Sequence, residues 1–212
     1  MNPPLGISRI GSLSTRTAHP RFLYDYLNFT RSIGAYTGTL VNPFMYESKT
    51  DIMNNIRRWQ HPLIKRSISC AHVGTFVRMQ GISGVSHCGY CIPCIYRRLA
   101  LMSVGLDQAS NYICDVFTKL SFLTAAKQED IRYLSRFAKQ IVTASDIELR
   151  CRVVSHGLFP SNVGQSIGPT GSDNYKPWAD MLKRWADDLI YRLQHNTNRE
   201  TRNILGIRNI SK

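Results

Sequence analysis

The spacing of apolar side chains predicts a chain that is mostly α-helical. In residues 20–34 apolar positions recur every three or four residues, as on one face of a helix, and Gly34 provides a stop. The same period runs through residues 127–142 and through a longer segment at 176–194. The expected core-facing positions of these helices are Phe22, Leu23, Tyr26, Leu27, Thr30 and Ile33; Ile131, Leu134, Phe137, Ala138 and Ile141; and Trp178, Leu182, Trp185, Leu189 and Leu193.

Two capping boxes mark the starts of further helices. In the first, at residues 48–51, a serine is followed three residues later by an aspartate, which predicts a helix through about Trp59. The His61-Pro62 pair is expected to end that helix. The second capping box, at residues 145–148, starts another helix.

The remaining segments are shorter. Residues 91–105 have a helical pattern that tolerates Pro93 in its first turn. Residues 38–44 are a short strand candidate. The tail from Asn196 is polar and basic and is expected to fray.

Four cysteines have the spacing of a metal site, C-x17-C-x2-C-x2-C. Zinc prefers four tetrahedral ligands, and a C-x2-C pair lets two thiolates reach one ion across a tight turn, for which Gly89 supplies a flexible backbone. His72 and His87 flank the group, and either could replace the first cysteine as a ligand. The alternative is a set of buried or redox-active thiols, which explains the crowding less well. The predicted zinc ligands are Cys70, Cys88, Cys91 and Cys94.

A zinc ion held by four thiolates has no open position for water or substrate, so the predicted site is structural. Arg97 and Arg98 follow the last cysteine and could form an anion-facing surface at the start of a helix. The alternative for either is a solvated arginine. Two further cysteines, Cys114 and Cys151, are expected to be small core residues.

The net charge of +13 favours polyanionic or acidic partners. No acidic residue lies between Asp51 and Asp107, so the cysteine group sits in a stretch of one sign. A basic surface that only keeps the protein soluble explains the charge about equally well. The basic residues of the stretch are Arg57, Arg58, Lys65, Arg66, Arg78, Arg97 and Arg98.

The sequence also bears on the compartment. It has no apolar run of about 18 residues that could span a membrane, and its first residues lack the apolar region of a signal peptide. We therefore expect a cytoplasmic protein, in which clustered thiols bind metal more often than they form disulfides.

A second candidate binding segment precedes the first helix. Residues 15–20, "TRTAHP", place hydroxyl groups, a guanidinium and an imidazole directly before a helix start, where phosphate or carboxylate can bind. The candidate residues are Arg16, Thr17 and His19. Capping by Thr17 beside an ordinary surface arginine is the alternative.

With Cys70 and "SKTDIM" upstream of it, the motif "HCGYCIPCIYRR" resembles the 7-cyano-7-deazaguanine synthase (QueC-like) family. That family has a Thr-Lys-acid helix start, a Ser-Cys, and then Cys-Gly-x-Cys-x-x-Cys-x-x-Arg. In this chain Lys49 stands at the Thr-Lys position, with Ser48 replacing the threonine, and Arg97 is the trailing arginine. The longer spacing before Cys88 and the region beyond residue 110 are more similar to the QatC type of the Qat anti-phage system.

The resemblance implies a doubly wound α/β fold of the ATP-pyrophosphatase (PP-loop) type, of which this chain would be the C-terminal half. It implies ATP-dependent activation of a 7-deazapurine carboxylate, with zinc structural and ATP with magnesium as cofactor. The chain has no Ser-Gly-Gly-x-Asp-Ser loop to hold the phosphates, so a missing domain or a partner chain would supply it, and alone the chain would be inactive. Other proteins of the defence operon would be partners. Lys49 and Arg97, with Arg16, Thr17 and His19, are the candidate substrate or nucleotide ligands.

The same reading divides the chain into four consecutive segments. Residues 1–66 would be the remnant of the nucleotide α-hydrolase-like domain, and residues 67–105 the zinc module. Residues 106–195 would be a helical extension, and residues 196–212 a basic tail.

Two readings without catalysis remain open. One is a zinc-stabilised module that binds nucleic acid, suggested by the charge, although aromatic residues are not interleaved with the basic ones as stacking would require. The other is an assembly subunit that docks through the helix at 178–193, whose apolar stripe core packing explains equally well.

Overall fold

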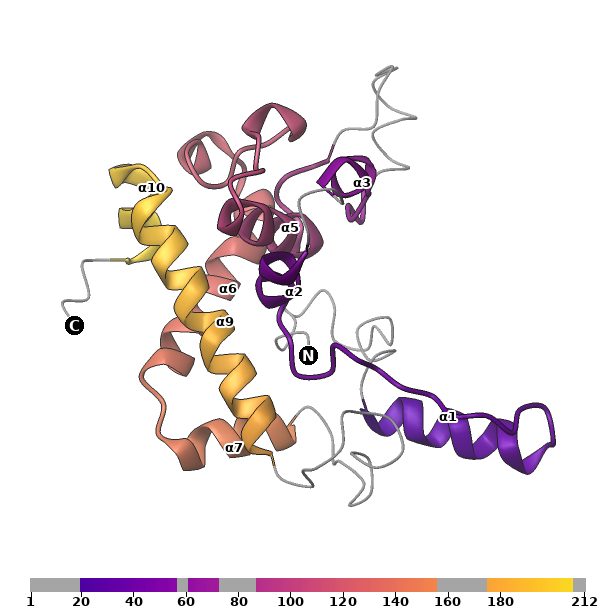
Figure 1. Cartoon of the computed structure of the whole chain (residues 1–212). Helices are drawn as coiled ribbons and strands as arrows, with labels where there is room; N and C mark the ends of the chain where they lie inside the picture. Colours follow the sequence, from indigo (N-terminus) through magenta and orange to yellow (C-terminus); the bar gives the residue numbers. More distant parts are fainter. Residues whose placement is uncertain (1–19, 57–60, 73–86, 156–174, 208–212) are drawn as a thin grey trace. The chain divides into compact units, whose positions relative to one another are not determined.

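A computed structural model describes residues 20–56, 61–72, 87–155 and 175–207. This part of the chain is mostly helical, as predicted, and its only strand-like pairing is a single parallel bridge between His87 and Tyr112. The PP-loop fold therefore remains an expectation. The α-helices are α1 (Pro20–Ser32), α2 (Lys49–Asn55), α3 (His61–Arg66), α5 (Ile92–Ser103), α6 (Ala125–Val142), α7 (Asp146–Ser155), α9 (Lys176–His195) and α10 (Arg199–Leu205), with short 3₁₀ turns at Ala109–Asn111 and Leu120–Phe122 (Figure 1).

The chain divides into two compact units, each built from two separate stretches of sequence. One comprises residues 1–47 and 140–184, and the other residues 48–139 and 185–212. The four consecutive segments expected from the sequence stay a prediction. No helix in the described ranges is both long enough and apolar enough to cross a membrane.

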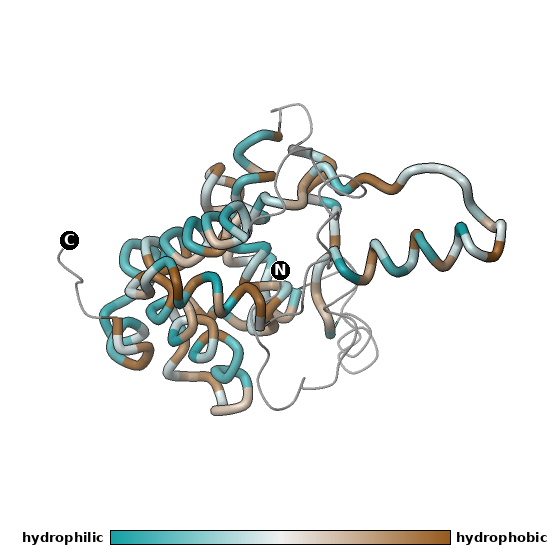
Figure 2. The backbone as a smooth tube through the Cα atoms, turned by 90° about the horizontal axis from the view of Figure 1, so that it is seen from below, coloured by the Kyte–Doolittle hydropathy of each residue, from teal (hydrophilic) through white to brown (hydrophobic). Residues whose placement is uncertain are grey.

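The first unit contains α1 and α7. The helix predicted at residues 20–34 is confirmed, and Gly34 ends it with a φ of +68°. The predicted core face is only partly right, because Leu27 and Thr30 are buried whereas Phe22 and Tyr26 are exposed. Hydrophilic and hydrophobic positions alternate along the helix (Figure 2). The segment between helices α1 and α2 contains turns and no strand, so the prediction of a strand at residues 38–44 is wrong.

The capping box that begins α7 has the expected contacts. The backbone N–H of Ser145 donates to the Glu148 carboxylate at 2.8 Å, and the Ser145 hydroxyl caps the helix in return. In the same unit Tyr46 packs edge-on against Trp178, with ring centroids 5.1 Å apart, and its carbonyl accepts a hydrogen bond from Arg184.

The second unit packs α2 against α5 (Figure 1). Their contact is apolar and centres on Met53, Ala100 and Leu101. The Ser48–Asp51 capping box is confirmed, and α2 ends at Asn55 with Ile56 as its C-cap; residues 57–60 lie outside the described part. The His61-Pro62 pair lies at the start of α3, where a proline in the first turn is tolerated, so it begins a helix rather than ending one.

Helix α6 has the predicted core face: Ile131, Leu134, Phe137, Ala138 and Ile141 are all buried. The tail that follows α9 does not fray at once, which corrects the prediction from Asn196. Asn198 caps α10, Gly206 ends it with a φ of +62°, and Leu205 is buried. Lys139 of α6 donates to the Leu205 carbonyl at 2.7 Å, so a tertiary contact holds the tail that local sequence could not reveal.

Candidate metal centre

The start of α5 is fixed by contacts from distant parts of the same unit. Cys91 is the N-cap residue, and Pro93 lies in the first turn as predicted. Cys91 makes no side-chain cap, and instead the Asp130 carboxylate of α6 accepts the N–H of Ile92 at 3.0 Å. A carboxylate at a helix N-terminus satisfies a free N–H and interacts favourably with the helix dipole.

Gly89 provides the turn between two of the cysteines. Its φ is +83°, and a Cβ built there would lie 1.9 Å from the backbone oxygen of Cys114. The close approach arises because the residues before it pair with the chain after α5: the N–H of Cys114 donates to the carbonyl of Cys88 at 3.0 Å. The glycine predicted to allow a tight turn is therefore required both for its backbone conformation and for its lack of a side chain.

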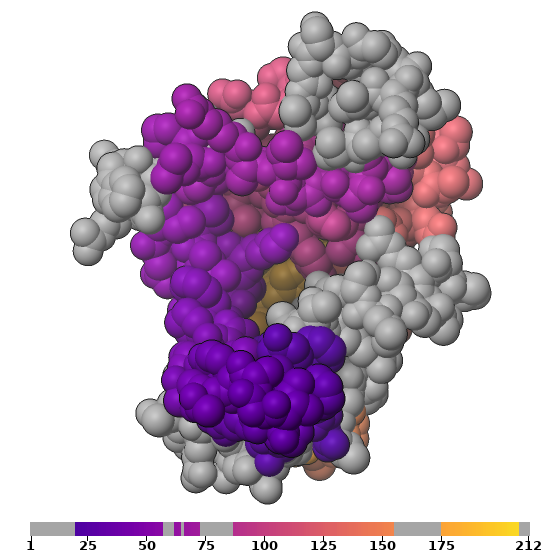
Figure 3. All heavy atoms as spheres, turned by 90° about the vertical axis from the view of Figure 1, so that its right-hand side faces the viewer, coloured from indigo at the N-terminus to yellow at the C-terminus, as the bar shows by residue number. Residues whose placement is uncertain are grey.

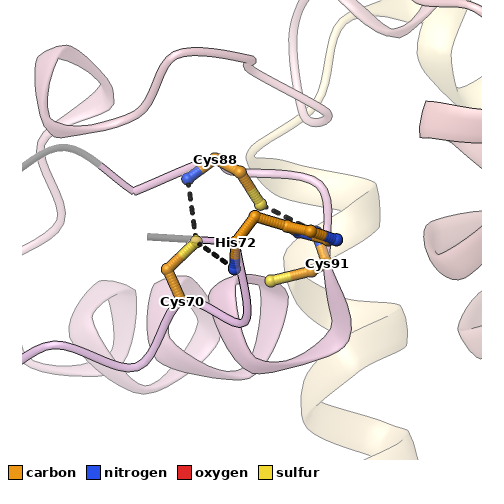
Figure 4. Close-up of side chains that lie close together, drawn as sticks. All are labelled: Cys70, His72, Cys88 and Cys91. Atoms are coloured by element: carbon orange, nitrogen blue, oxygen red, sulfur yellow. Dashed lines mark hydrogen bonds between the residues drawn. The ribbon is translucent and has the colours of Figure 1, made fainter. Parts of the chain in front are cut away.

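Five potential metal ligands lie together at this point. The ligand atoms of Cys70, His72, Cys88 and Cys91 are all within 4.8 Å of one another (Figure 4). The sulfur of Cys94 is 3.7 Å from that of Cys88. Three of the cysteines, at positions 88, 91 and 94, are fully buried.

Backbone N–H groups point at the sulfur atoms. The Cys70 sulfur accepts from the N–H groups of His72 and Cys88, each at 3.3 Å, and the Cys88 sulfur accepts from the N–H of Cys91 at 3.4 Å (Figure 4). Such donors stabilise negative charge on sulfur, so the backbone is arranged to hold thiolates, the form that binds metal.

The buried thiols also act on one another. Hydrogen bonds from the thiols of Cys88 and Cys94 lower the pKa of Cys91, and the N–H of Ala71 lowers it further. The partnership with the Cys91 sulfur raises the pKa of Cys88 to about 12. The hydrogen bond with Cys88 likewise raises the pKa of Cys94, against the opposite effect of the Gly89 N–H.

The residues fit a zinc ion, or another ion that prefers soft ligands. Thiolate and imidazole are the donors of structural zinc sites, whereas calcium and magnesium require oxygen. The Nδ1 atom of His72 is buried and has no hydrogen-bond partner among the described residues, as expected of a nitrogen that faces a metal. The group could therefore bind a metal ion, and its chemistry is compatible with structural zinc.

Two candidate substrate or nucleotide ligands lie beside this centre. Lys49, the first residue of α2, is exposed along its side chain, yet the surrounding protein removes enough water from the amine to lower its pKa. The positive charge of Arg97 lowers the pKa of Lys49 further, while Cys91 and Cys94 oppose that change. Lys49 and Arg97 are therefore electrostatic neighbours of each other and of the cysteines.

Neither arginine of the "YRR" sequence is a solvated surface group. Arg97 is 7% exposed and donates to the hydroxyl of Ser67 at 2.6 Å and to the carbonyl of Ile64 at 2.9 Å. These bonds tie α5 to the end of α3. The Nε atom of Arg97 is buried without a hydrogen-bond partner among the described residues, so its N–H is available to another group.

Arg98 forms buried ion pairs within the chain. Its guanidinium lies 2.6 Å from a carboxylate oxygen of Asp115 and 3.1 Å from one of Asp107, between the rings of Tyr112 and Phe117. The charge is thus neutralised within the chain, and the expected anion-facing role is wrong for this residue. Removing one partner of a buried pair of this kind typically costs about 3–5 kcal/mol.

The other predicted residues divide into three groups. Arg16, Thr17 and His19 lie outside the described residues. Cys114 is buried as predicted, but Cys151 is exposed, so it is not a core residue. His87 is buried close to the cysteines, and burial and Arg97 lower its pKa, but it is not part of the four-residue group.

The sequence named His72 only as a substitute for Cys70, whereas the structure brings both into one group. The two-residue spacing between them was the available signal. Nothing local could have identified Asp130 as the cap of α5, because it lies 38 residues away in the sequence.

Comparisons with models of protein families, with curated proteins and with solved structures found no match to this chain.

Proposed function

We propose that this chain is the zinc-stabilised portion of a QueC-like, ATP-dependent ligase that activates a 7-deazapurine carboxylate, of the QatC type that acts in bacterial anti-phage defence. The observation that supports the proposal most is the assembly of Cys70, Cys88, Cys91 and Cys94 at the start of α5, with Lys49 beside them. These are the residues that carry the resemblance to that family.

In this proposal the metal has a structural role. Zinc, when bound, cross-links the segment around Cys70 to the first turn of α5 and fixes the position of that helix. Helix α5 in turn holds Arg97, and α2 presents Lys49. The amine of Lys49 would bind the carboxylate or a phosphate, and the free Nε of Arg97 would donate one further hydrogen bond.

The structure weakens the argument from net charge for nucleic-acid binding. Arg97 and Arg98, two of the basic residues in the acid-free stretch, are buried and bonded to their own chain. A guanidinium whose charge is paired with carboxylates inside the chain, as that of Arg98 is, cannot contribute to the salt-dependent contacts with phosphates that such binding needs.

The test is pyrophosphate release by the native protein, purified from its source cells together with the proteins that accompany it. We expect release from ATP with magnesium only when a 7-deazapurine carboxylate is added. Lys49→Ala should reduce it about 10- to 100-fold, the effect of losing a hydrogen bond to a charged group, with unchanged zinc content. Lys183→Ala, on the exposed side of α9, is the control and should have no effect. No release from a zinc-loaded native assembly that binds ATP would overturn the proposal.

A further inference from the structure

The centre has more donors than a zinc ion needs. Zinc in structural sites takes four ligands in a tetrahedron. Cys70, Cys88 and Cys91 are common to the spacing motif and to the compact group in the structure, and the fourth ligand differs between the two. The motif supplies Cys94, whereas the compact group supplies His72.

His72 is held as a ligand would be. Its ring stacks on Tyr90, with centroids 5.2 Å apart and planes at 29°, and its backbone N–H donates to the Cys70 sulfur. The amine of Lys127, on α6, lies 5.7 Å from the centre of the Tyr90 ring. The stack fixes the orientation of the imidazole, and its buried Nδ1 has no partner in the described part of the chain.

Cys94 is equally well placed. Its side chain is fully buried in the first turn of α5, and its sulfur is 3.7 Å from that of Cys88. Two sulfurs at that distance can bind one tetrahedral ion, because zinc–sulfur bonds are about 2.3 Å long. Both candidates therefore reach the position beside Cys88.

We propose that His72 and Cys94 share the fourth coordination position of a five-donor centre. The inference rests on the metal centre of the proposed function, but not on the ligase assignment. With Cys94 bound, four thiolates and Zn²⁺ carry a net charge of −2; with His72 bound, three thiolates and a neutral imidazole leave −1. The exchange replaces one donor by the other without releasing the ion, and the displaced Cys94 thiolate takes up a proton from water, so that charge is balanced.

Cobalt(II) substitution of the full chain tests this, because its absorption reports both tetrahedral geometry and the number of thiolates. We expect Cys94→Ser to keep a tetrahedral spectrum with weaker thiolate-to-cobalt charge transfer and shifted ligand-field bands. Adding His72→Asn to Cys94→Ser should weaken cobalt binding more than about 100-fold, beyond the effect of changes outside the ligands. Adding His87→Asn instead is the matched control and should change nothing further.

Equal cobalt affinity of Cys94→Ser and of its His72→Asn double variant would overturn the proposal, as would loss of tetrahedral cobalt from Cys94→Ser alone. Zinc-edge X-ray absorption of the wild-type protein needs no variant to fold: a sulfur number between three and four with imidazole scattering supports the shared position, and four sulfurs without imidazole contradicts it. The zinc content of the wild-type protein distinguishes failure of the shared position from failure of the metal centre. A wild-type protein without zinc would refute the metal centre itself.

Discussion

Helices α5 and α1 are nearly equal in length, 12 and 13 residues, and both are amphipathic, yet their surroundings differ greatly. In α5 eight residues are buried, including both arginines, and its first turn carries thiols of the candidate metal centre. In α1, which Figure 3 shows as indigo spheres, only Pro20, Leu27 and Thr30 are buried. The large apolar side chains of Phe22, Tyr26 and Phe29 are exposed.

The difference shows that the spacing of apolar residues in the sequence does not determine how deeply a helix is buried. The period predicts a helix, but which face is buried depends on groups elsewhere in the chain. Helix α5 is held by the Asp130 cap, by the Arg98 ion pairs and by the cysteine group. The described polar contacts of α1 include the exposed Arg21–Asp25 pair one turn apart, which contributes little stability. Substitutions in the two regions should therefore differ in effect by a wide margin.

The largest effect is expected for Cys91→Ser. Serine is a poor zinc ligand, and structural zinc contributes on the order of 10 kcal/mol to folding in small domains, so both zinc and the order around α5 should be lost. Zinc content by mass spectrometry and thermal unfolding measure the two effects. Cys151→Ser, at an exposed thiol, is the control and should change the free energy of unfolding by less than about 0.5 kcal/mol. Full zinc occupancy in Cys91→Ser would rule out Cys91 as a ligand.

Gly89→Ala should have the next largest effect, about 2–4 kcal/mol of unfolding free energy. The new Cβ would lie 1.9 Å from the backbone oxygen of Cys114, and a backbone atom cannot move away as the end of a flexible side chain could. Gly105→Ala is a matched control, because Gly105 has a similar φ of +70° and open space around it. It should cost only the backbone strain, about 1–2 kcal/mol. Chemical denaturation of the zinc-loaded proteins measures both, and equal costs would mean that the contact with Cys114 is not formed.

The sequence predicted α5 and the grouping of Cys70, Cys88 and Cys91, because their signals are local: cysteine spacing, an early proline and a glycine turn; the predicted fourth ligand, Cys94, stays a prediction, because the compact group contains His72 instead. It predicted the environment of Arg97 and Arg98 poorly, because their partners, among them Ser67 and Asp115, are brought close only by tertiary packing. For α1 the period identified the helix but not the buried face. The tail was underestimated for the same reason, since Lys139 holds it from 66 residues away.

A smaller effect that depends on pH is expected at Asp115. Burial raises its pKa, but hydrogen bonds from Thr118 and Arg98 more than offset this, so that the pKa lies below its usual value. A carboxylate with a lowered pKa stabilises the fold above its unfolded pKa of about 3.9, and this contribution is lost as the pH falls through the folded pKa. Asp115→Asn should cost about 2 kcal/mol at neutral pH, less than a fully broken pair because Asp107 remains.

The difference between wild type and Asp115→Asn should be constant above about pH 5 and shrink below about pH 4. Urea unfolding across this range measures it. A difference that persists unchanged into acid would show that Asp115 stabilises the fold by packing and not through its charge.

The smallest effect is expected on the open face of α1. Phe29 is 60% exposed, so Phe29→Ser should change the free energy of unfolding by less than about 0.5 kcal/mol. Leu27, two residues earlier on the same helix, is 1% exposed, and Leu27→Ala should cost about 2–5 kcal/mol. Unfolding of the two variants, followed by circular dichroism, compares the faces within one helix. If Phe29→Ser costs as much as Leu27→Ala, the face of α1 that carries Phe29 is covered in the native protein. The two helices would then differ in what covers them and not in how much of each helix is buried.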